Sequence, residues 1–342
     1  MAVANFAVLT RIYKLSSGKK ASGLSVTTTG LFSLIWFSPV QAENWLWGWQ
    51  LQWFLSVFGV LVAFHGLAKL PNMNRREFVI MIMGAVLAHY SLGSGIIVWP
   101  LLTLGLLFLK APNKKVFTLI GIASASIIFD FATQADKPLV APRTIFLEEP
   151  VNFMRYILTY LGRPIYFEGL IPPIAGLIIV TIFFGSIVIV FKKYKKRVSA
   201  ITPWIALGLY AIGSATVTAV SRLGLGLDQA FTSRYTTISS LLLVSTMAIV
   251  LLNKDILVAQ YVKKRRVKLV SISTSAVLGA FVLANAAWGI RWMMVHRATM
   301  VSIRTCTIID NPTADCLRLT YPDPDNIKDR LHYLKAIKWG GY

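Results

Sequence analysis

Long apolar runs, separated by short groups of Lys and Arg, constrain this chain more than any other feature. Of its 342 residues, 56% are hydrophobic and only 14% are charged, whereas an ordinary soluble domain is about 25% charged. The runs are apolar on all sides and show no amphipathic period, as helices in contact with lipid must. The sequence therefore predicts an all-α integral membrane protein.

We predict about nine transmembrane or part-spanning helices, with a range of roughly eight to ten. An unaided span needs roughly 17–25 apolar residues, and shorter spans are tolerated inside a bundle or where a helix is broken. The clearest candidates are Leu51–Ala68, Leu170–Phe191, Ile201–Val220 and Leu269–Ile290, and the shorter ones are Leu24–Phe37, Val79–Tyr90, Gly95–Leu109, Val116–Phe131 and Ile238–Leu252.

The basic groups fall at every second gap between the apolar segments. Because Lys and Arg near the ends of spans stay in the cytoplasm, this alternation records orientation. We expect the chain to start in the cytoplasm, to cross the bacterial inner membrane an odd number of times and to end outside. The groups predicted to be cytoplasmic lie within residues 11–20, 69–76, 110–115, 192–197 and 254–268.

The formal net charge is +21, a value also typical of proteins that bind nucleic acid. Here the basic residues are dispersed over many loops instead of following one face. Anionic lipid headgroups attract such loops by about 1 kcal/mol for each basic residue near the surface. We therefore expect membrane lipids as partners, and no nucleic acid.

Three regions are expected along the chain. Residues 1–23 form a cytoplasmic N-terminal segment, 24–290 a polytopic transmembrane domain, and 291–342 an extracytoplasmic tail. The apolar stretch Met1–Thr10 is too short to cross a bilayer. It has the character of the inner end of a span, which predicts that the start of that span is missing.

Residues 130–168 form the longest polar interruption and are expected to be an external loop. Within this loop, the aromatic residues of Phe146–Leu161 lie near helical spacing. That pattern predicts an amphipathic helix, either lying on the outer surface or packed against the bundle.

The only two cysteines of the chain, Cys306 and Cys316, both fall in the expected tail. The segment between them is rich in turn-forming residues, and disulfides persist mainly outside the cytosol. We expect a disulfide here, and two free thiols are the alternative.

Tryptophans crowd one segment that the charge pattern places at the outer membrane interface. Trp45, Trp47 and Trp49 lie between Glu43 and Gln50. Anchoring at the interface explains the tryptophans but not their polar neighbours. Aromatic faces also stack on sugar rings, and carboxylates and carboxamides bond sugar hydroxyls. The sharper hypothesis is a sugar site in which these residues bind substrate and Glu43 is catalytic.

A second polar group lies in a short outer loop between two predicted spans. It contains Arg222, Asp228, Gln229, Arg234 and Tyr235. The forked donors of two guanidinium groups match a phosphate or diphosphate. We expect Asp228 to orient one of them and to be the second catalytic candidate, and the others to bind substrate. Contact with lipid headgroups, or an internal ion pair, is the alternative.

Small residues break one apolar run directly after His89. Ser91, Gly93 and Ser94 allow either a tight turn or a discontinuous helix at this point. A lone histidine is more often a packing residue than a ligand, and His89 does not lie in a metal-ligand spacing. We expect no metal site, and the sequence indicates no particular cofactor. It contains no serine nucleophile elbow or nucleotide-binding loop.

Four stretches carry a resemblance to known proteins. They read FSPVQAENWLWGWQLQWFL, SLGSGIIVWP, LGLDQAFTSRYTTISSLL and CLRLTYPDPDNIKDRLHYL. Together they resemble a group of bacterial multi-pass membrane proteins, which is similar in general layout to membrane glycosyltransferases of the GT-C type. The resemblance covers most of the chain from about residue 30. It implies a polyprenyl-phosphate sugar as donor and an acidic residue, commonly Asp, in the first external loop. Only Glu43 occupies that location, so the chain departs from the pattern there.

Three functions are compatible with these features. The leading hypothesis is a glycosyltransferase-like protein of cell-surface glycan assembly. Its base is Glu43 or a carboxylate of the missing upstream segment, and Arg222 and Arg234 neutralise the donor phosphate. The second is a carrier or flippase for a lipid-linked or anionic solute, which would use the break at Gly93–Gly95. The third is a non-catalytic membrane scaffold.

Overall fold

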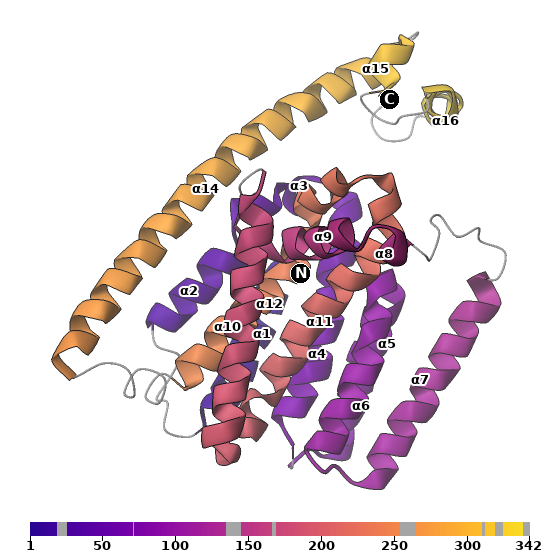
Figure 1. The fold of residues 1–342 in the computed structure, drawn as a ribbon. Helices are drawn as coiled ribbons and strands as arrows, with labels where there is room; N and C mark the ends of the chain where they lie inside the picture. Colours follow the sequence, from indigo (N-terminus) through magenta and orange to yellow (C-terminus); the bar gives the residue numbers. More distant parts are fainter. Residues whose placement is uncertain are drawn as a thin grey trace. The chain divides into compact units, whose positions relative to one another are not determined.

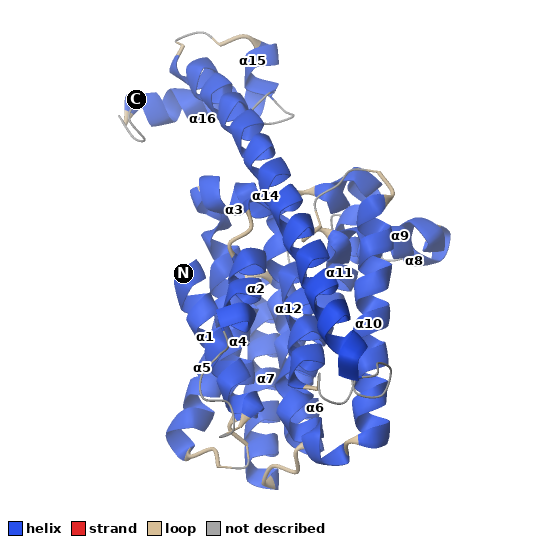
Figure 2. Cartoon of the chain, turned by 90° about the vertical axis from the view of Figure 1, so that its left-hand side faces the viewer, coloured by secondary structure: helices blue, strands red, loops and turns tan. Residues whose placement is uncertain are grey.

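The computed structural model describes residues 1–18, 26–70, 72–134, 145–165, 169–253, 264–309, 312–318 and 324–337. Within these ranges every regular element is a helix, and no strand occurs (Figure 1, Figure 2). The all-helical prediction is confirmed for this part of the chain. Two compact units are present, Met1–Gly289 and Ile290–Tyr342, and each is described by itself.

The elements of the first unit are mostly long helices joined by short 3-10 turns. The helices are α1 (Ala2–Ser17), α2 (Val26–Trp36), α3 (Ala42–Leu46), α4 (Leu51–Ala68), α5 (Arg75–Ser91), α6 (Val98–Phe108), α7 (Asn113–Gln134), α8 (Ile145–Glu148), α9 (Pro150–Gly162), α10 (Ile171–Lys193), α11 (Val198–Arg222) and α12 (Thr236–Leu252). The turns are η1 (Pro39–Gln41), η2 (Gly48–Gln50), η3 (Gly93–Ile97), η4 (Lys195–Arg197), η5 (Leu223–Leu225), η6 (Leu227–Phe231) and η7 (Ser233–Tyr235). Helix α14 (Lys264–Ile308) continues into the second unit, which also holds α15 (Ala314–Arg318) and α16 (Pro324–Ala336).

Five helical stretches of the described residues are long and apolar enough to cross a bilayer. They are Gly48–Ala68, Asn113–Thr133, Ile171–Lys193, Val198–Leu225 and Ser233–Leu252. Each overlaps a span predicted from the sequence, and together they indicate a membrane-embedded protein. Three other predicted spans fold as the shorter helices α2, α5 and α6, and the ninth falls within α14. The count of nine spans stays a prediction.

Most of the long helices of the first unit run alongside one another, and α8 and α9 lie across one end, so the bundle has two ends (Figure 1). The connections after α4 and α6 carry Lys69 and Lys110, and Lys192 lies in the last turn of α10. These three helices end on the same side of the bundle, which we call the lysine end (Figure 1). Helix α3 and the tryptophans of residues 45–49 lie at the other, which we call the tryptophan end. Of the predicted basic groups, residues 19–20 and 254–263 lie outside the described residues.

Helix α1 is part of the bundle. The buried Asn5 side chain donates to the carbonyl oxygen of Phe54 at 3.0 Å, and the Trp36 indole donates to the carbonyl oxygen of Ala2 at 3.0 Å. Leu9 is fully buried. Buried polar groups that find partners on other helices hold an element in one position. Residues 1–23 are predicted from the sequence to form a separate cytoplasmic segment, whereas in the structure α1 packs into the bundle.

Glycines allow two helix pairs to approach closely. A Cβ added at Gly59 of α4 would lie 2.5 Å from the carbonyl oxygen of Gly84 on α5, and one added at Gly176 of α10 would lie 2.0 Å from the carbonyl oxygen of Leu158 on α9. Small residues at such contacts are typical of helices packed in membranes. The second contact holds α9 against the bundle.

Helix α9 lies within the stretch expected to be an external loop. Its 13 residues are too few to span a bilayer, and its Tyr156 and Tyr160 are fully buried. Of the two arrangements predicted for Phe146–Leu161, the structure has the one packed against the bundle. Residues 135–144 and 166–168 of the expected loop lie outside the described part of the chain.

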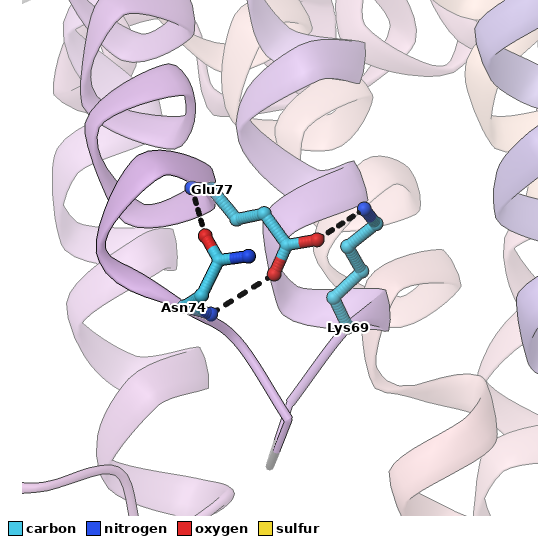
Figure 3. A network of polar contacts seen from close by, with 3 residues as sticks. All are labelled: Lys69, Asn74 and Glu77. Atoms are coloured by element: carbon cyan, nitrogen blue, oxygen red, sulfur yellow. Dashed lines mark hydrogen bonds and ion pairs between the residues drawn. The ribbon is translucent and has the colours of Figure 1, made fainter.

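A capping box begins α5 at the lysine end (Figure 3). The Asn74 side chain accepts from the Glu77 backbone N–H at 2.9 Å, and the Glu77 carboxylate accepts from the Asn74 backbone N–H at 3.0 Å. The second carboxylate oxygen pairs with the Lys69 ammonium. The bond from Lys69, followed by the backbone bond from Asn74, lowers the pKa of the Glu77 carboxyl. Such a box supplies partners for backbone groups that helix starts leave unpaired.

The second unit is closed by a disulfide. Cys306 of α14 and Cys316 of α15 are bonded, with their Cα atoms 5.6 Å apart. Helix α16 adds the Lys335 ammonium, which donates to the carbonyl oxygen of Ile309 at 2.7 Å. The pairing expected from the sequence is therefore present, and the extracytoplasmic location of this unit stays a prediction.

Candidate functional site

The tryptophan segment and the arginine loop are bonded to each other. The Glu43 backbone N–H donates to the Ser233 hydroxyl at 3.1 Å, and the Arg234 backbone N–H donates to the Glu43 carboxylate at 3.1 Å. The Asn44 side chain donates to the Arg234 carbonyl oxygen at 3.0 Å. These bonds join α3 to η7 across about 190 residues of sequence. The two segments singled out separately in the sequence thus form one surface.

A buried row of polar side chains supports this junction from within the bundle. Asn44 donates to the Thr237 hydroxyl at 2.6 Å, Thr237 donates to the Gln41 carboxamide at 2.6 Å, and Gln41 donates to the Trp36 carbonyl oxygen. All four side chains are at most 6% exposed. A buried polar group without a hydrogen-bond partner lowers stability by about 1–3 kcal/mol. Each side chain of this row therefore depends on its neighbour for a partner.

Glu43 itself is half-buried. One carboxylate oxygen, Oε2, accepts from the Arg234 backbone N–H. A carboxylate has about four lone-pair positions, so the other oxygen can accept a further hydrogen bond. Glu43 therefore combines a structural bond with a free face, which is the arrangement a positioned base requires.

Aromatic rings gather beside Arg234. The Tyr235 ring lies 5.6 Å from Trp53 and is stacked on Tyr160 at 4.7 Å, while its hydroxyl lies 3.5 Å from that of Tyr156. Burial raises the pKa of the Tyr156 hydroxyl, and the positive charge of Arg222 opposes part of that rise. Burial likewise raises the pKa of Tyr160. Both phenols stay neutral at physiological pH and keep their donor hydrogens.

Three arginines of this end lie partly or fully out of solvent. Arg163, just after α9, is 1% exposed and donates to the Thr232 carbonyl oxygen at 3.3 Å. Arg234 lies 5.8 Å from the centroid of the Tyr235 ring, and its Nε, like that of Arg155 on α9, is buried without a hydrogen-bond partner. Desolvated guanidinium groups with spare donors favour an anionic ligand.

Sequence reasoning did not single out Arg155 or Arg163, although both belong to the polar stretch 130–168. The signal that was available is the amphipathic pattern of Phe146–Leu161. Arg155 falls inside that pattern and Arg163 directly follows it. A helix packed against the bundle carries both toward the interior, whereas a helix on the surface would not.

Other predicted site residues lie at the edge of this junction. Trp47 and Trp49 are 47% and 72% exposed, and Trp45 packs on Phe37 and Phe54. Gln50 is buried, with its side-chain oxygen unbonded. Of the predicted substrate-binding residues here, Trp47 and Trp49 present the most open aromatic faces.

The remaining loop residues do not form the expected pair. Asp228 on η6 is exposed and makes no hydrogen bond or ion pair among the described residues, so it orients neither Arg222 nor Arg234 there. Gln229 is partly exposed, and its carbonyl oxygen accepts from the Thr232 hydroxyl at 2.9 Å. Arg222 is exposed at the end of α11. The carboxylate that meets the arginine loop is Glu43.

The break after His89 is also present. Helix α5 ends at Ser91, and the turn η3 leads into α6. His89 is 6% exposed, with its ring 4.7 Å from that of Tyr90, and both ring nitrogens lack a hydrogen-bond partner. The Ser94 hydroxyl is buried and unbonded as well.

In the described ranges no group of three or more His, Cys, Asp or Glu side chains could hold a metal ion. What the tryptophan end offers is one half-buried carboxylate, several guanidinium groups and neutral phenols. This set can bind an anion and accept a proton. Comparison of the chain with protein-family models, with curated proteins and with solved structures finds no match.

Proposed function

We propose that this protein is a glycosyltransferase-like membrane protein that binds a polyprenyl-phosphate sugar at its tryptophan end. The observation that carries the proposal is the bonded junction of Glu43 with Ser233 and Arg234. It supports the proposal because a carboxylate and an arginine are held within one surface, as transfer from a phosphate-linked donor requires.

The donor phosphate binds through Arg234, with Arg222 at the edge and the charge of Arg163 behind. A guanidinium with a buried, unbonded Nε is ready to donate, and phosphate accepts from such forked donors in pairs. The lipid chain of the donor lies among the apolar helix surfaces of the bundle.

The sugar lies toward Trp47 and Trp49, whose exposed faces can stack on its ring. Glu43 takes the proton of the acceptor hydroxyl through its free carboxylate oxygen. In this proposal the tryptophan end faces the outside of the bacterial inner membrane and the lysine end faces the cytoplasm, because Lys-rich loops stay inside.

The test compares variants that separate structure from chemistry. Glu43→Gln keeps an oxygen that accepts from the Arg234 backbone N–H but removes the base. We expect unchanged donor binding and a transfer rate lower by about 10²–10⁴-fold. Arg234→Gln should weaken binding of a polyprenyl-phosphate hexose in nanodiscs about tenfold, and the exposed Arg76 at the lysine end, changed to Gln, is the matched control. Unchanged donor binding by Arg234→Gln would overturn the proposal.

A second function is favoured by the break after His89. Two ring nitrogens and the Ser94 hydroxyl are buried without partners beside a discontinuity between helices, and polar groups at breaks in membrane helices often line solute paths. A carrier or flippase would use this feature. Movement of the lipid-linked phosphate across proteoliposomes, with no covalent product, would place this function ahead of transfer.

A further inference from the structure

An apolar cavity of about 480 Å³ lies between α6, α10 and α11, on the lysine side of the bundle. Its walls are aliphatic and aromatic, and Thr202 is the one lining residue with a polar side chain. That hydroxyl already donates to the Val198 carbonyl oxygen at 2.9 Å. The cavity therefore offers no unused hydrogen-bonding side chain and is suited to hydrocarbon.

The lining residues explain its shape. Ala206 of α11 is a small wall residue that leaves space between the helices, and Gly105 of α6 lines the cavity with its backbone, since a Cβ there would instead meet Leu67 of α4 at 2.7 Å. The Phe108 and Phe191 rings, with centroids 5.7 Å apart, close the space at the lysine end. Leu104 lines the cavity and is 61% exposed, so the cavity opens on the outer surface of α6, where lipid would lie. A flexible chain can enter from the side.

A lysine lies close in sequence to each phenylalanine of this aromatic pair. Lys110 follows Phe108 closely in sequence, and Lys192 follows Phe191 directly. Both lysines are exposed, and neither ammonium group takes part in a hydrogen bond or ion pair within the described ranges. At this end the described carboxylate is Glu77, which is already paired with Lys69. A headgroup above the cavity would thus meet unpaired ammonium groups.

We infer that this cavity binds one acyl chain of an anionic phospholipid, with the lipid phosphate held by Lys110 and Lys192. A second copy of the chain fits less well, because apolar helix surfaces gain no hydrophobic energy by meeting in lipid and need small or polar residues for close contact. For the same reason the acyl chain alone gives little preference, and the selection of lipid comes from charge. The inference is independent of the proposed transfer reaction.

The experiment is native mass spectrometry of the full chain with phosphatidylglycerol and phosphatidylcholine that carry identical acyl chains. We expect tighter binding of phosphatidylglycerol, by about fivefold for each lysine. The double variant Lys110→Gln/Lys192→Gln should bind both lipids equally. Arg76→Gln removes a positive charge from the same end but outside the cavity and should keep the preference.

A second pair of variants tests the cavity itself. Ala206→Phe fills it and should weaken binding of both lipids, with thermal unfolding measured alongside. Leu209→Trp, at a partly exposed wall position, serves if Ala206→Phe does not fold. The inference is overturned if the double lysine variant still prefers phosphatidylglycerol, if a folded filled variant binds lipid like the original chain, or if the bound species is a second copy.

Discussion

The two ends of the first unit use positive charge differently. At the tryptophan end, Arg163 is buried, and Arg155 and Arg234 each have a buried Nε without a partner. At the lysine end, Lys110 and Lys192 are exposed, and Lys69 forms a local pair with Glu77. Exposed cations are hydrated and contribute little to stability, whereas desolvated ones require a counter-charge or hydrogen-bond acceptors.

The exposed lysines serve the orientation of the chain in the membrane, whereas the desolvated arginines are suited to binding a particular anion. The hydrated lysines need only an anionic membrane surface. This agrees with the rule that Lys and Arg near the ends of spans stay in the cytoplasm. The desolvated arginines gain more from one anion in a fixed position. The bond that Glu43 accepts from the Arg234 backbone and the bond that Asn44 donates to it keep η7 in place. The net charge of +21 therefore combines exposed lysines with desolvated arginines, and composition alone does not distinguish the two.

The largest effect is expected where α9 brings its arginines to the tryptophan end. Gly176→Ala places a Cβ 2.0 Å from the Leu158 carbonyl oxygen, a backbone atom that cannot rotate away. We expect the free energy of unfolding to fall by about 3 kcal/mol, as measured by thermal or denaturant unfolding in detergent. Gly185→Ala, on the same helix with open space around it, should be neutral or slightly stabilising. Equal behaviour of the two variants would contradict this packing.

A smaller effect is expected for the junction. Asn44→Ala removes the bonds that the Arg234 carbonyl oxygen and the Thr237 hydroxyl accept from Asn44, and should lower the free energy of unfolding by about 1–2 kcal/mol. It should also weaken donor binding, since the arginine loop loses its support. Asn152→Ala removes an exposed bond to Glu149 and is the control, with almost no expected change. Equal stability and equal donor binding of Asn44→Ala and Asn152→Ala would contradict the role given to the junction.

The smallest effect is expected at the lysine end and depends on pH. The pKa of Glu77 is lowered in the folded protein, so its contribution to stability is present above the ordinary value near 4.5 and is lost as the pH falls through the folded value. Unfolding temperatures of the original chain and of Glu77→Gln should therefore converge as the solution is acidified below that ordinary value. A constant difference down to the lowest pH would show that the carboxylate charge contributes nothing.

Much of the fold was predictable because lipid imposes simple rules. Apolar length located five long helices, and charge alternation placed residues 45–49 and Arg234 at the same end. The position of α1 was not predictable, since it depends on single bonds such as that from Asn5 to Phe54. The role of Arg163 was missed because an amphipathic helix has the same pattern on a surface or against a bundle. The isolation of Asp228 depends on the exact course of η6.

The most direct test of the account is the sidedness of three introduced thiols, at Trp47→Cys, Leu225→Cys and Arg76→Cys. All three positions are exposed, and the two native cysteines are already bonded to each other. With a thiol reagent that does not cross membranes, we predict that positions 47 and 225 react in intact cells and that position 76 reacts only after permeabilisation. Reaction of positions 47 and 225 from opposite sides of the membrane would contradict the proposed site.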